Sequence, residues 1–247
     1  YISDSNNHRI RKIDRNSGII STVAGTGVKG DNGYDNIPAL ESTLNFPTGI
    51  YVDTTNGVDD IYIADRKNNK IRLINGTSGN ITTVAGDGGF FYDNDDVLAT
   101  DTKIGNPWAV SLDPLSGDVY IADTYNDRIR VVDGTTKIIH TLSGTGEYGY
   151  YGNNIDPINA TYSRPRGISF MSILVLFTLL TARAIALDKQ SRKKPQHHHQ
   201  LSILLQPPHP SRWPLRQHFA KLMNIVALII NVMSALVVST VTRPYIH

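Results

Sequence analysis

Apolar residues in this chain cluster in short β-branched runs, and no stretch between them shows the 3.6-residue period of an amphipathic helix. One set of such runs covers 49–52, 62–64, 71–73 and 81–84, and connections rich in Gly, Asp and Asn separate them. Val, Ile, Thr and Tyr favour strands, whereas Gly, Asp and Asn favour turns. Between 65 and 69, an Asp side chain can accept turn N–H bonds and Asn tolerates the left-handed conformation, so we expect a hairpin. The pattern predicts four antiparallel strands in this unit.

The unit repeats along the first two thirds of the chain. YISDSNNHRIRKID at 1–14 matches YIADRKNNKIRLIN at 62–75 and YIADTYNDRIRVVD at 120–133, which gives periods of 61 and 58 residues. The blocks IISTVAG, ITTVAG and IIHTLSG follow at a fixed distance, and FPTGIYVD, NPWAVSLD and RPRGISF form a third set. Four short strands at fixed spacing indicate the blades of a β-propeller. We therefore expect an all-β fold, a partial β-propeller of about three four-stranded blades, with repeats at about 1–46, 47–106 and 107–164 and the start of another at 165–170.

The repeat is defined by a tyrosine, an aspartate, an asparagine and a basic residue at fixed spacing. These structural positions are Tyr1, Asp4, Asn7 and Arg9, then Tyr62, Asp65, Asn68 and Lys70, then Tyr120, Asp123, Asn126 and Arg128. With the Thr-Val-Ala-Gly block and the Pro-x-Gly-Ile strand, this pattern resembles the NHL-repeat β-propeller family, in particular its long-repeat subgroup with Gly-Asp-rich inserts. The resemblance covers 1–170. It implies four-stranded blades, usually six in a ring, that serve as a binding or scaffold platform.

Charge divides the chain at the point where the repeat stops. Residues 1–170 carry 15 Lys and Arg against 21 Asp and Glu, a net charge of −6, whereas 171–247 carry a net charge of +8. Back-translating 171–187 with permitted codons, followed by the first two bases of the Asp188 codon, and adding one guanine in front gives DVYTGFIYIADSTGNRIR, which restores the missing part of a blade in register. We therefore expect the tail 171–247 to be a frameshift product, helical or disordered, from a sequencing error, a gene-model error or a pseudogene mutation.

Taken literally, the tail suggests membrane spans instead. Residues 171–187 and 222–241 are mostly apolar and reach the lower length range for a bilayer-spanning helix. The segment between them is basic, as expected of a cytoplasmic loop. A membrane-anchored extracellular propeller is therefore an alternative, and a membrane partner is expected only if the tail is genuine. Sequons at Asn75, Asn80 and Asn159 also tilt the expected location outward.

Candidate chemistry is sparse in 1–170. A metal-dependent lyase or hydrolase-type enzyme of the NHL class is a second alternative, but His8 and His140 do not recur as a ligand set, so we predict no catalytic residue, metal or cofactor. The acidic run 93–96 could bind a hard cation weakly, although solvated loop charge is favoured. The Gly-rich runs 24–33 and 85–89 lack a following helix and are expected to cross between blades rather than bind phosphate.

Binding to another protein is the favoured function. Trp108 is the best candidate for an exposed aromatic anchor. Arg11, Arg72 and Arg130 recur at equivalent positions and could form a local basic rim, although outward-pointing charges that support turns explain them as well. The net charge of −6 opposes a nucleic-acid footprint, so we expect none. The sequence thus predicts a non-enzymatic interaction or scaffold module with a protein or peptide partner.

Overall fold

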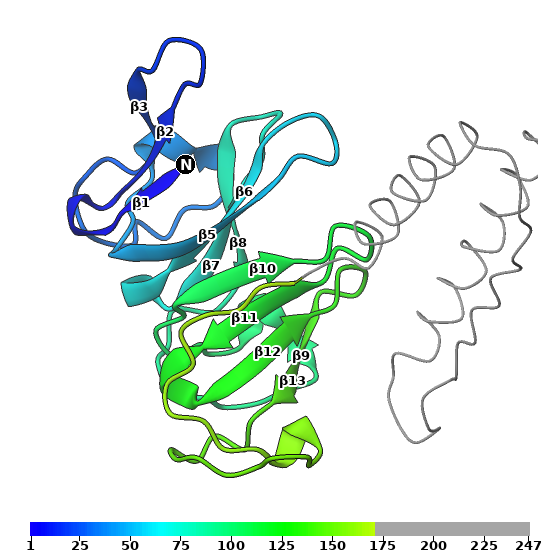
Figure 1. Ribbon diagram of the computed structural model, residues 1–247. Coiled ribbons are helices and arrows are strands. Elements are labelled where there is room, and N and C mark those ends of the chain that lie inside the picture. The colour runs from blue at the N-terminus through cyan, green and yellow to red at the C-terminus, as the bar shows by residue number, and fades with distance from the viewer. Residues whose placement is uncertain (171–247) are drawn as a thin grey trace, which may run out of the picture. The chain divides into compact units, whose positions relative to one another are not determined.

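The computed structural model describes residues 1–170, and they form three antiparallel sheets that follow one another in chain order (Figure 1). The fold is all-β, and the expectation of a partial β-propeller is confirmed. The candidate membrane spans at 171–187 and 222–241, the basic segment between them and the expected frameshift tail lie outside the described residues. Within 1–170, the structure contains no helix with the length and apolar character that a membrane span needs. The repeat boundaries given above stay a prediction.

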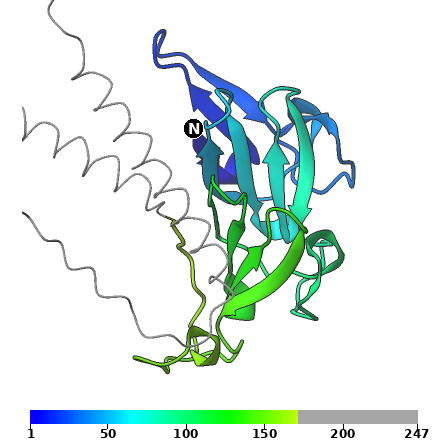
Figure 2. The ribbon, with the colours of Figure 1, turned by 90° about the vertical axis from the view of Figure 1, so that its right-hand side faces the viewer.

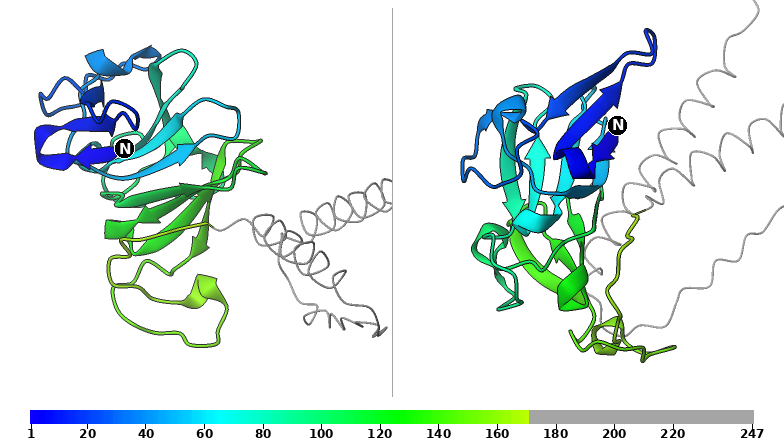
Figure 3. Two further views of the ribbon diagram at one scale, coloured as in Figure 1. Left: turned by 45° about the horizontal axis from the view of Figure 1, so that its top comes forward. Right: turned by 90° about the vertical axis from the view of Figure 1, so that its left-hand side faces the viewer.

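The first sheet has three strands and the next two have five each (Figures 2 and 3). The first consists of β1 (Ile2–Asp4), β2 (Arg9–Ile13) and β3 (Ile20–Ala24). The second consists of β4 (Ile37–Pro38), β5 (Pro47–Asp53), β6 (Asp60–Asp65), β7 (Lys70–Ile74) and β8 (Asn80–Ala85), in the order β4-β8-β7-β6-β5. The third consists of β9 (Val97–Leu98), β10 (Ala109–Leu112), β11 (Val119–Asp123), β12 (Arg128–Val132) and β13 (Ile138–Ser143), in the order β10-β11-β12-β13-β9. We call these sheets blades 1, 2 and 3.

The predicted strands of blade 2 all form, and the structure adds a short outer strand that the sequence did not predict. Ile37 pairs with Ile81 and Pro38 with Asn80, so β4 covers the free edge of β8. In blade 3, β9 covers β13 in the same way. Each outer strand belongs to the Gly-rich insert that precedes its blade, so the insert passes around the outside of the blade before the inner strand begins. Covering an edge satisfies backbone groups that would otherwise invite non-specific pairing.

The core lies between successive blades. One cluster of buried residues joins Ile10 and Ala24 of blade 1 to Ile61, Ile63 and Ile81 of blade 2. A second cluster joins the opposite face of blade 2 to blade 3; its members include Ala64, Ile71, Val110, Ile121 and Ile139. Because side chains alternate between the faces of a strand, each blade has two apolar faces and buries one against each neighbour. Tyr62 packs against the second cluster, between blades 2 and 3.

Short 3₁₀ helices occupy the hairpin turns and the inserts. The turns hold η1 (Ser5–Asn7), η3 (Arg66–Asn68) and η5 (Thr124–Asn126), and the inserts hold η2 (Ala39–Glu41), η4 (Ala99–Asp101) and η6 (Pro157–Asn159). Each turn helix ends on a residue in the left-handed conformation, namely His8, Asn69 or Asp127. Asn and Asp tolerate that conformation better than most residues do. The prediction of a turn at 65–69 with a left-handed Asn is therefore correct.

Candidate partner-binding surface

Hydrogen bonds between blades bring the hairpin turns and the starts of the inner strands to the same end of the blades. The side chain of each left-handed turn residue accepts a bond from the backbone at the next inner strand. The three pairs are His8 Nδ1 with the Phe46 N–H at 3.1 Å, Asn69 Oδ1 with the Asn106 N–H at 3.0 Å, and Asp127 Oδ1 with the Arg164 N–H at 2.6 Å. Turn residues of one blade therefore lie beside the residues that start the next.

Six side chains of these turns and strand starts form what we call the Arg–aromatic surface: Phe46, Arg66, Trp108, Tyr125, Arg164 and Arg166. Its centre is the indole of Trp108, because the guanidinium carbons of Arg66 and Arg166 lie 4.2 and 4.6 Å from its ring centroid. Arg66 also lies 5.5 Å from the ring of Phe46, and Arg164 lies 4.6 Å from that of Tyr125. Cations at these distances are attracted to the negative face of an aromatic ring.

The backbone of Trp108 is held firmly. Its carbonyl oxygen accepts bonds from the Gly49 N–H and the Thr48 hydroxyl, each at 2.8 Å, and its own N–H donates to the carbonyl of Ala122 at 3.2 Å. A Cβ on Gly49 would stand 2.6 Å from the Cα of Ala109, so only glycine allows the two inner strands to come this close. Trp108 itself is half-buried. Its ring is therefore presented from a rigid part of the scaffold.

The arginines of this surface have no acidic partner among residues 1–170. No carboxylate within that range lies at ion-pair distance from Arg66, Arg164 or Arg166, and Arg66 Nε is buried without an acceptor there. Burial lowers the pKa of Arg66 from its ordinary value, with a smaller contribution from the charge of Arg166. A guanidinium remains charged at neutral pH even so. The surface thus offers charged, partly desolvated donors beside aromatic rings.

Two buried carboxylates lie beneath the turns. Asp65 accepts the Asn45 N–H and the Asn68 side-chain amide, each at 2.8 Å, and Asp123 accepts the Gly105 N–H at 2.7 Å. Burial raises the pKa of Asp65 to about 7 and that of Asp123 to about 6. The expectation that Asp65 accepts N–H groups of its own turn holds for the side-chain amide of Asn68, whereas its backbone donor, Asn45, belongs to the preceding insert. The two carboxylate oxygens of Asp65 thus bind one donor in the preceding insert and one in the turn, and Asp65 anchors the insert to the hairpin.

The other repeat-defining residues lie at equivalent places in each blade. Asn7 donates to Asp4 at 2.8 Å, as Asn126 does to Asp123. Arg9 and Arg128 each donate to two carbonyls, one in the turn and one after the last strand, whereas Lys70 pairs with Asp31 at 2.6 Å. Tyr1 packs on the first core cluster, and Tyr120 stacks on Phe170 with ring centroids 5.1 Å apart.

The recurring arginines do not form a basic rim. Arg72 and Arg130 have exposed fractions of 1% and 0%, so neither guanidinium faces solvent, and only Arg11 is partly accessible, where it pairs with Asp4 at 3.6 Å. The ladder is irregular at this position in each blade, between Ile71 and Arg72 in blade 2 and between Ile129 and Arg130 in blade 3. The extra residue of this irregularity lies on the partner strand, so Arg72 and Arg130 keep the regular alternation of their own strands. The insert that precedes each blade covers the guanidinium group, and this burial was not visible in the strand pattern.

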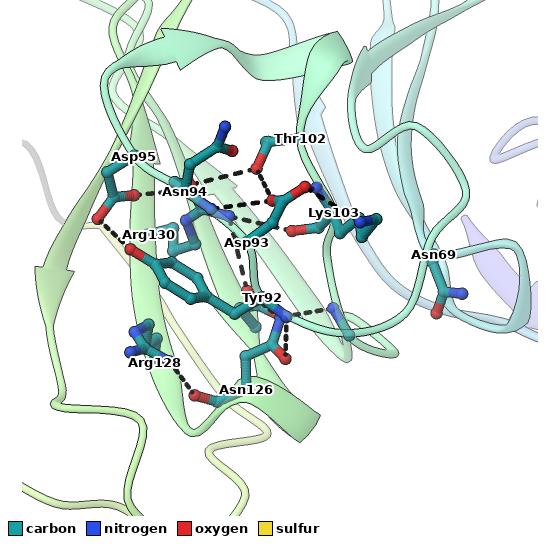
Figure 4. A network of polar contacts seen from close by, with 12 residues as sticks. Asn69, Tyr92, Asp93, Asn94, Asp95, Thr102, Lys103, Asn126, Arg128 and Arg130 are labelled. Carbon is teal, nitrogen blue, oxygen red and sulfur yellow. Dashed lines mark hydrogen bonds and ion pairs between the residues drawn. The ribbon is translucent and has the colours of Figure 1, made fainter.

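Arg130 instead holds the insert that precedes its blade (Figure 4). Its guanidinium donates to the carbonyl of Asn94 at 2.5 Å, to Asp95 at 2.7 Å and to the carbonyl of Lys103 at 3.1 Å. Arg72 binds the carbonyl of Tyr34 and the carboxylate of Asp35 in the same manner, at 3.2 and 3.1 Å. The buried arginines are thus structural clamps.

The acidic run 93–96 does not converge on a cation site. Asp93 binds Thr102 and Lys103, Asp95 binds Arg130, and Asp96 pairs with His140 at 2.6 Å. Within 1–170, no three His, Cys, Asp or Glu side chains gather closely enough to hold a metal ion. His8 serves as the acceptor described above. The metal-dependent lyase alternative therefore has no ligand set in the described part of the chain.

Sequence reasoning found Trp108 but missed its neighbours. Arg66 occupies the repeat position that holds Ser5 in blade 1 and Thr124 in blade 3. Arg166 occupies the repeat position that holds Thr48 and Trp108 in the two preceding repeats. These two arginines could therefore have been found from the sequence only as positions where the repeats differ from one another. The partner-binding role of Trp108 stays a prediction.

Comparison with known proteins agrees with the repeat pattern. No family model matches the chain. Human NHL repeat-containing protein 2 is 24% identical over 166 residues, covering 64% of this chain and 22% of the human protein, and its cattle counterpart is 23% identical, covering 68% and 34%. The chloroplastic protein SUPPRESSOR OF QUENCHING 1 of Arabidopsis thaliana is 23% identical over 230 residues, covering 68% and 22%.

The human and cattle relatives carry the name that the repeats suggested. Together with the repeat pattern, these similarities support an NHL-repeat segment over residues 1–170. The chain spans about a fifth to a third of the length of the curated relatives it matches. Among solved structures, a Bacteroides thetaiotaomicron protein of unknown function gives a TM-score of 0.48 at 15% identity, covering 67% of this chain and 38% of that one. An auxiliary nutrient binding protein of Bacteroides ovatus gives 0.42 at 19% identity, covering 56% and 33%.

Proposed function

We propose that the NHL-repeat segment is a non-enzymatic protein-interaction module and that its partner docks on the Arg–aromatic surface with Trp108 as the anchor. One observation carries the proposal: two guanidinium groups lie over the indole of Trp108, and neither has a carboxylate partner within residues 1–170. Trp, Tyr and Arg are the residue types that dominate binding energy at protein interfaces. A rigidly held ring also loses little entropy when it is covered.

The same charges indicate an acidic partner. Guanidinium groups bind carboxylates through paired, charge-assisted hydrogen bonds, which are stronger when the donor is already partly removed from water. Arg66 and Arg166 would each gain a carboxylate, and the partner would cover the indole with an apolar or aromatic side chain. The net charge of −6 over 1–170 slows the approach of such a partner but does not oppose short-range pairing at a locally basic site.

Tryptophan fluorescence gives a direct test. The chain has two tryptophans, so a Trp213→Phe background leaves Trp108 as the single reporter. We expect short Asp/Glu-rich peptides with one aromatic residue to change its emission on binding, and their Gln/Asn counterparts to bind at least about tenfold more weakly. With a fluorescently labelled peptide, Trp108→Ala is expected to weaken binding by about 30-fold.

Arg15→Gln provides the matched control, because Arg15 is an exposed arginine outside the surface. Arg166→Gln should weaken peptide binding by about tenfold, whereas Arg15→Gln should leave it almost unchanged. Equal losses in the two variants would mean non-specific attraction and would contradict the proposal. Tight binding of a uridine oligonucleotide that depends on Trp108 and Arg166, without binding of acidic peptides, would replace the protein partner by a nucleic acid.

A further inference from the structure

The insert before blade 3 shows what a completed insert looks like (Figure 4). Tyr92 donates its hydroxyl to Asp95 three residues later, at 3.1 Å, and Asp95 also accepts from Arg130. The ring of Tyr92 carries both arginines of the Arg-Ile-Arg strand, with Arg128 at 3.8 Å and Arg130 at 5.2 Å from its centroid. A tyrosine and an acceptor three residues later therefore form the receptor for the two arginines of the blade.

The insert after blade 3 has the same receptor without its arginines. Tyr150 donates its hydroxyl to Asn153, again three residues later, at 3.2 Å. The Tyr150 side chain is 82% exposed, and no arginine within 1–170 lies over its ring. A large exposed ring held by a preformed hydrogen bond is a docking feature that lacks its occupant.

The backbone that would pair with an outer strand is also preformed. Asn36 and Asp96 stand just before β4 and β9 in the left-handed conformation, and each donates its N–H to the last strand of its blade, at 2.8 and 2.9 Å. Asn154 has the same conformation, with φ 57°. Within 1–170, however, its N–H has no recorded acceptor, and Ile155, which follows it, is 38% exposed.

The segment that corresponds to the inner strand of the next blade lies against blade 3, although it forms no strand. Residues 167–170 follow Pro165 as 49–52 follow Pro47. The Phe170 N–H donates to the Ser111 hydroxyl at 2.9 Å, and the Phe170 ring stacks on Tyr120 of blade 3. The described chain thus contributes segments at the inner and outer positions of a further blade, and none of the three strands that stand between those positions in blades 2 and 3.

We infer that 144–170 is the docking edge for a fourth NHL blade, and that this blade follows Phe170 in the adjacent reading frame. The sequence obtained by adding one guanine, DVYTGFIYIADSTGNRIR, supplies the residues that the edge requires. Its Arg-Ile-Arg places two arginines at the positions of Arg128 and Arg130, where they bind Tyr150 and Asn153. The asparagine just before this Arg-Ile-Arg aligns with Asn69 and Asp127, whose side chains accept a backbone N–H group at the start of the next blade. The codon choice was free only at synonymous positions, so the agreement with the structural receptor is an independent observation.

Two measurements test this inference. The first is the transcript of the source, read from the codon of Arg164 onward. We expect one additional nucleotide after Phe170 and an open frame that encodes the Tyr-Ile-Ala-Asp and Arg-Ile-Arg blocks. A transcript that encodes the 247-residue chain without interruption would overturn the inference.

The second measurement compares amide hydrogen exchange, by NMR, in the protein translated from that transcript and in the 247-residue chain. We expect the Asn154 amide to exchange at least about tenfold more slowly in the translated protein, approaching Asn36 and Asp96, because an acceptor strand then covers it. Asn36 and Asp96 serve as internal standards, since their acceptors are present in both proteins. Equal exchange at Asn154 in the two proteins would overturn the docking.

A substitution pair identifies the receptor. In the translated protein, Tyr150→Ala should lower the melting temperature, whereas Tyr151→Ala, which removes a neighbouring ring that is 66% exposed, should not. In the 247-residue chain neither change should matter, because no arginine lies over Tyr150 within 1–170. If Tyr150→Ala has the same effect in both proteins, Tyr150 is not the site where a fourth blade docks.

Discussion

Two groups of arginines in this protein behave in opposite ways. Arg72 and Arg130 occupy the same position of successive repeats, are fully buried, and bind carboxylates and carbonyls of the inserts. Arg66 and Arg166 occupy positions where the repeats differ, lie against the ring of Trp108, and have no acidic partner in 1–170. The first group stabilises each blade, and the second is available to another molecule.

The difference teaches where to look for function in a repeat protein. A residue that recurs in every blade answers a requirement that every blade shares, such as clamping an insert. A partner touches only a few blades, and the residues that recognise it need not recur. In this chain the sequence suggested that the recurring arginines form a basic rim. The residues suited to binding are instead those at positions where the repeats differ. The predictions below test that division, from the largest expected effect to the smallest.

Removing a clamp arginine should have the largest effect. Arg130→Ala removes a buried guanidinium that donates to Asp95 and to two carbonyls, and we expect a loss of about 3 kcal/mol in the free energy of unfolding. Arg11→Ala, at the equivalent but partly exposed position, should cost below about 1 kcal/mol. Urea denaturation of both variants measures the difference. Equal losses would show that burial by the insert does not distinguish these arginines.

The buried carboxylates predict a dependence of stability on pH. Burial raises the pKa of Asp65 to about 7 in the folded protein, above the value of about 4 expected in the unfolded chain. The folded state therefore holds its proton more tightly, and the stabilisation that results is complete below pH 4 and is lost as the pH rises toward 7.

Asp65→Asn isolates this contribution. We expect the free energy of unfolding of the wild type, relative to the variant, to fall by about 2 kcal/mol or more between pH 4 and pH 8. Asp133→Asn is the opposite control, because backbone N–H donors, mainly that of Thr136, lower the pKa of the partly exposed Asp133. A wild type that gains stability over Asp65→Asn as the pH rises would show that the hydrogen bonds to the carboxylate outweigh its burial.

Substitution of His8, whose repeat position holds Asn69 and Asp127 in the other blades, should have an intermediate effect on the free energy of unfolding. His8 accepts the Phe46 N–H where the other blades use Asn69 and Asp127. His8→Ala should therefore cost about 1 kcal/mol in thermal or urea unfolding, whereas His8→Asn should keep the bond and cost almost nothing. If Asn and Ala have equal effects at this position, the hydrogen bond between blades contributes nothing measurable.

The smallest effect on stability is expected at the Arg–aromatic surface. Arg66→Ala and Arg166→Ala should each change the free energy of unfolding by less than about 1 kcal/mol, because each removes a stacking contact on a ring and no buried ion pair. Denaturation curves measured beside those of Arg130→Ala provide the comparison. A loss as large as that of Arg130→Ala would move these residues into the structural group.

Much of the fold could be predicted from the sequence because its determinants are local. The β-branched runs of blade 2 became β5 to β8, and Asn69 adopts the left-handed conformation that the turn composition indicated. The outer strand β4 could not be predicted, since Ile37 and Pro38 form a strand only by pairing with β8, more than forty residues later. One donor to the Asp65 carboxylate, the Asn45 N–H, could not be predicted for the same reason, because it lies in the preceding insert.

The candidate site was predicted only in part. The sequence singled out Trp108 as a candidate aromatic anchor. Its contacts with Arg66 and Arg166, however, join residues from three different repeats. No spacing in the sequence encodes that proximity. The expectation for Arg72 and Arg130 failed because the insert that precedes each blade folds over the guanidinium group, a contact between residues far apart in the chain.

By itself, the sequence determined that this segment consists of repeated four-stranded units with turns at fixed places, because strand and turn preferences depend on neighbouring residues. The tertiary structure alone decided which arginines are buried and which meet Trp108, and it left Tyr150 exposed beside an unpaired Asn154 N–H within 1–170. Burial and contact depend on the packing of one blade against the next, and that packing joins residues that are far apart in the chain.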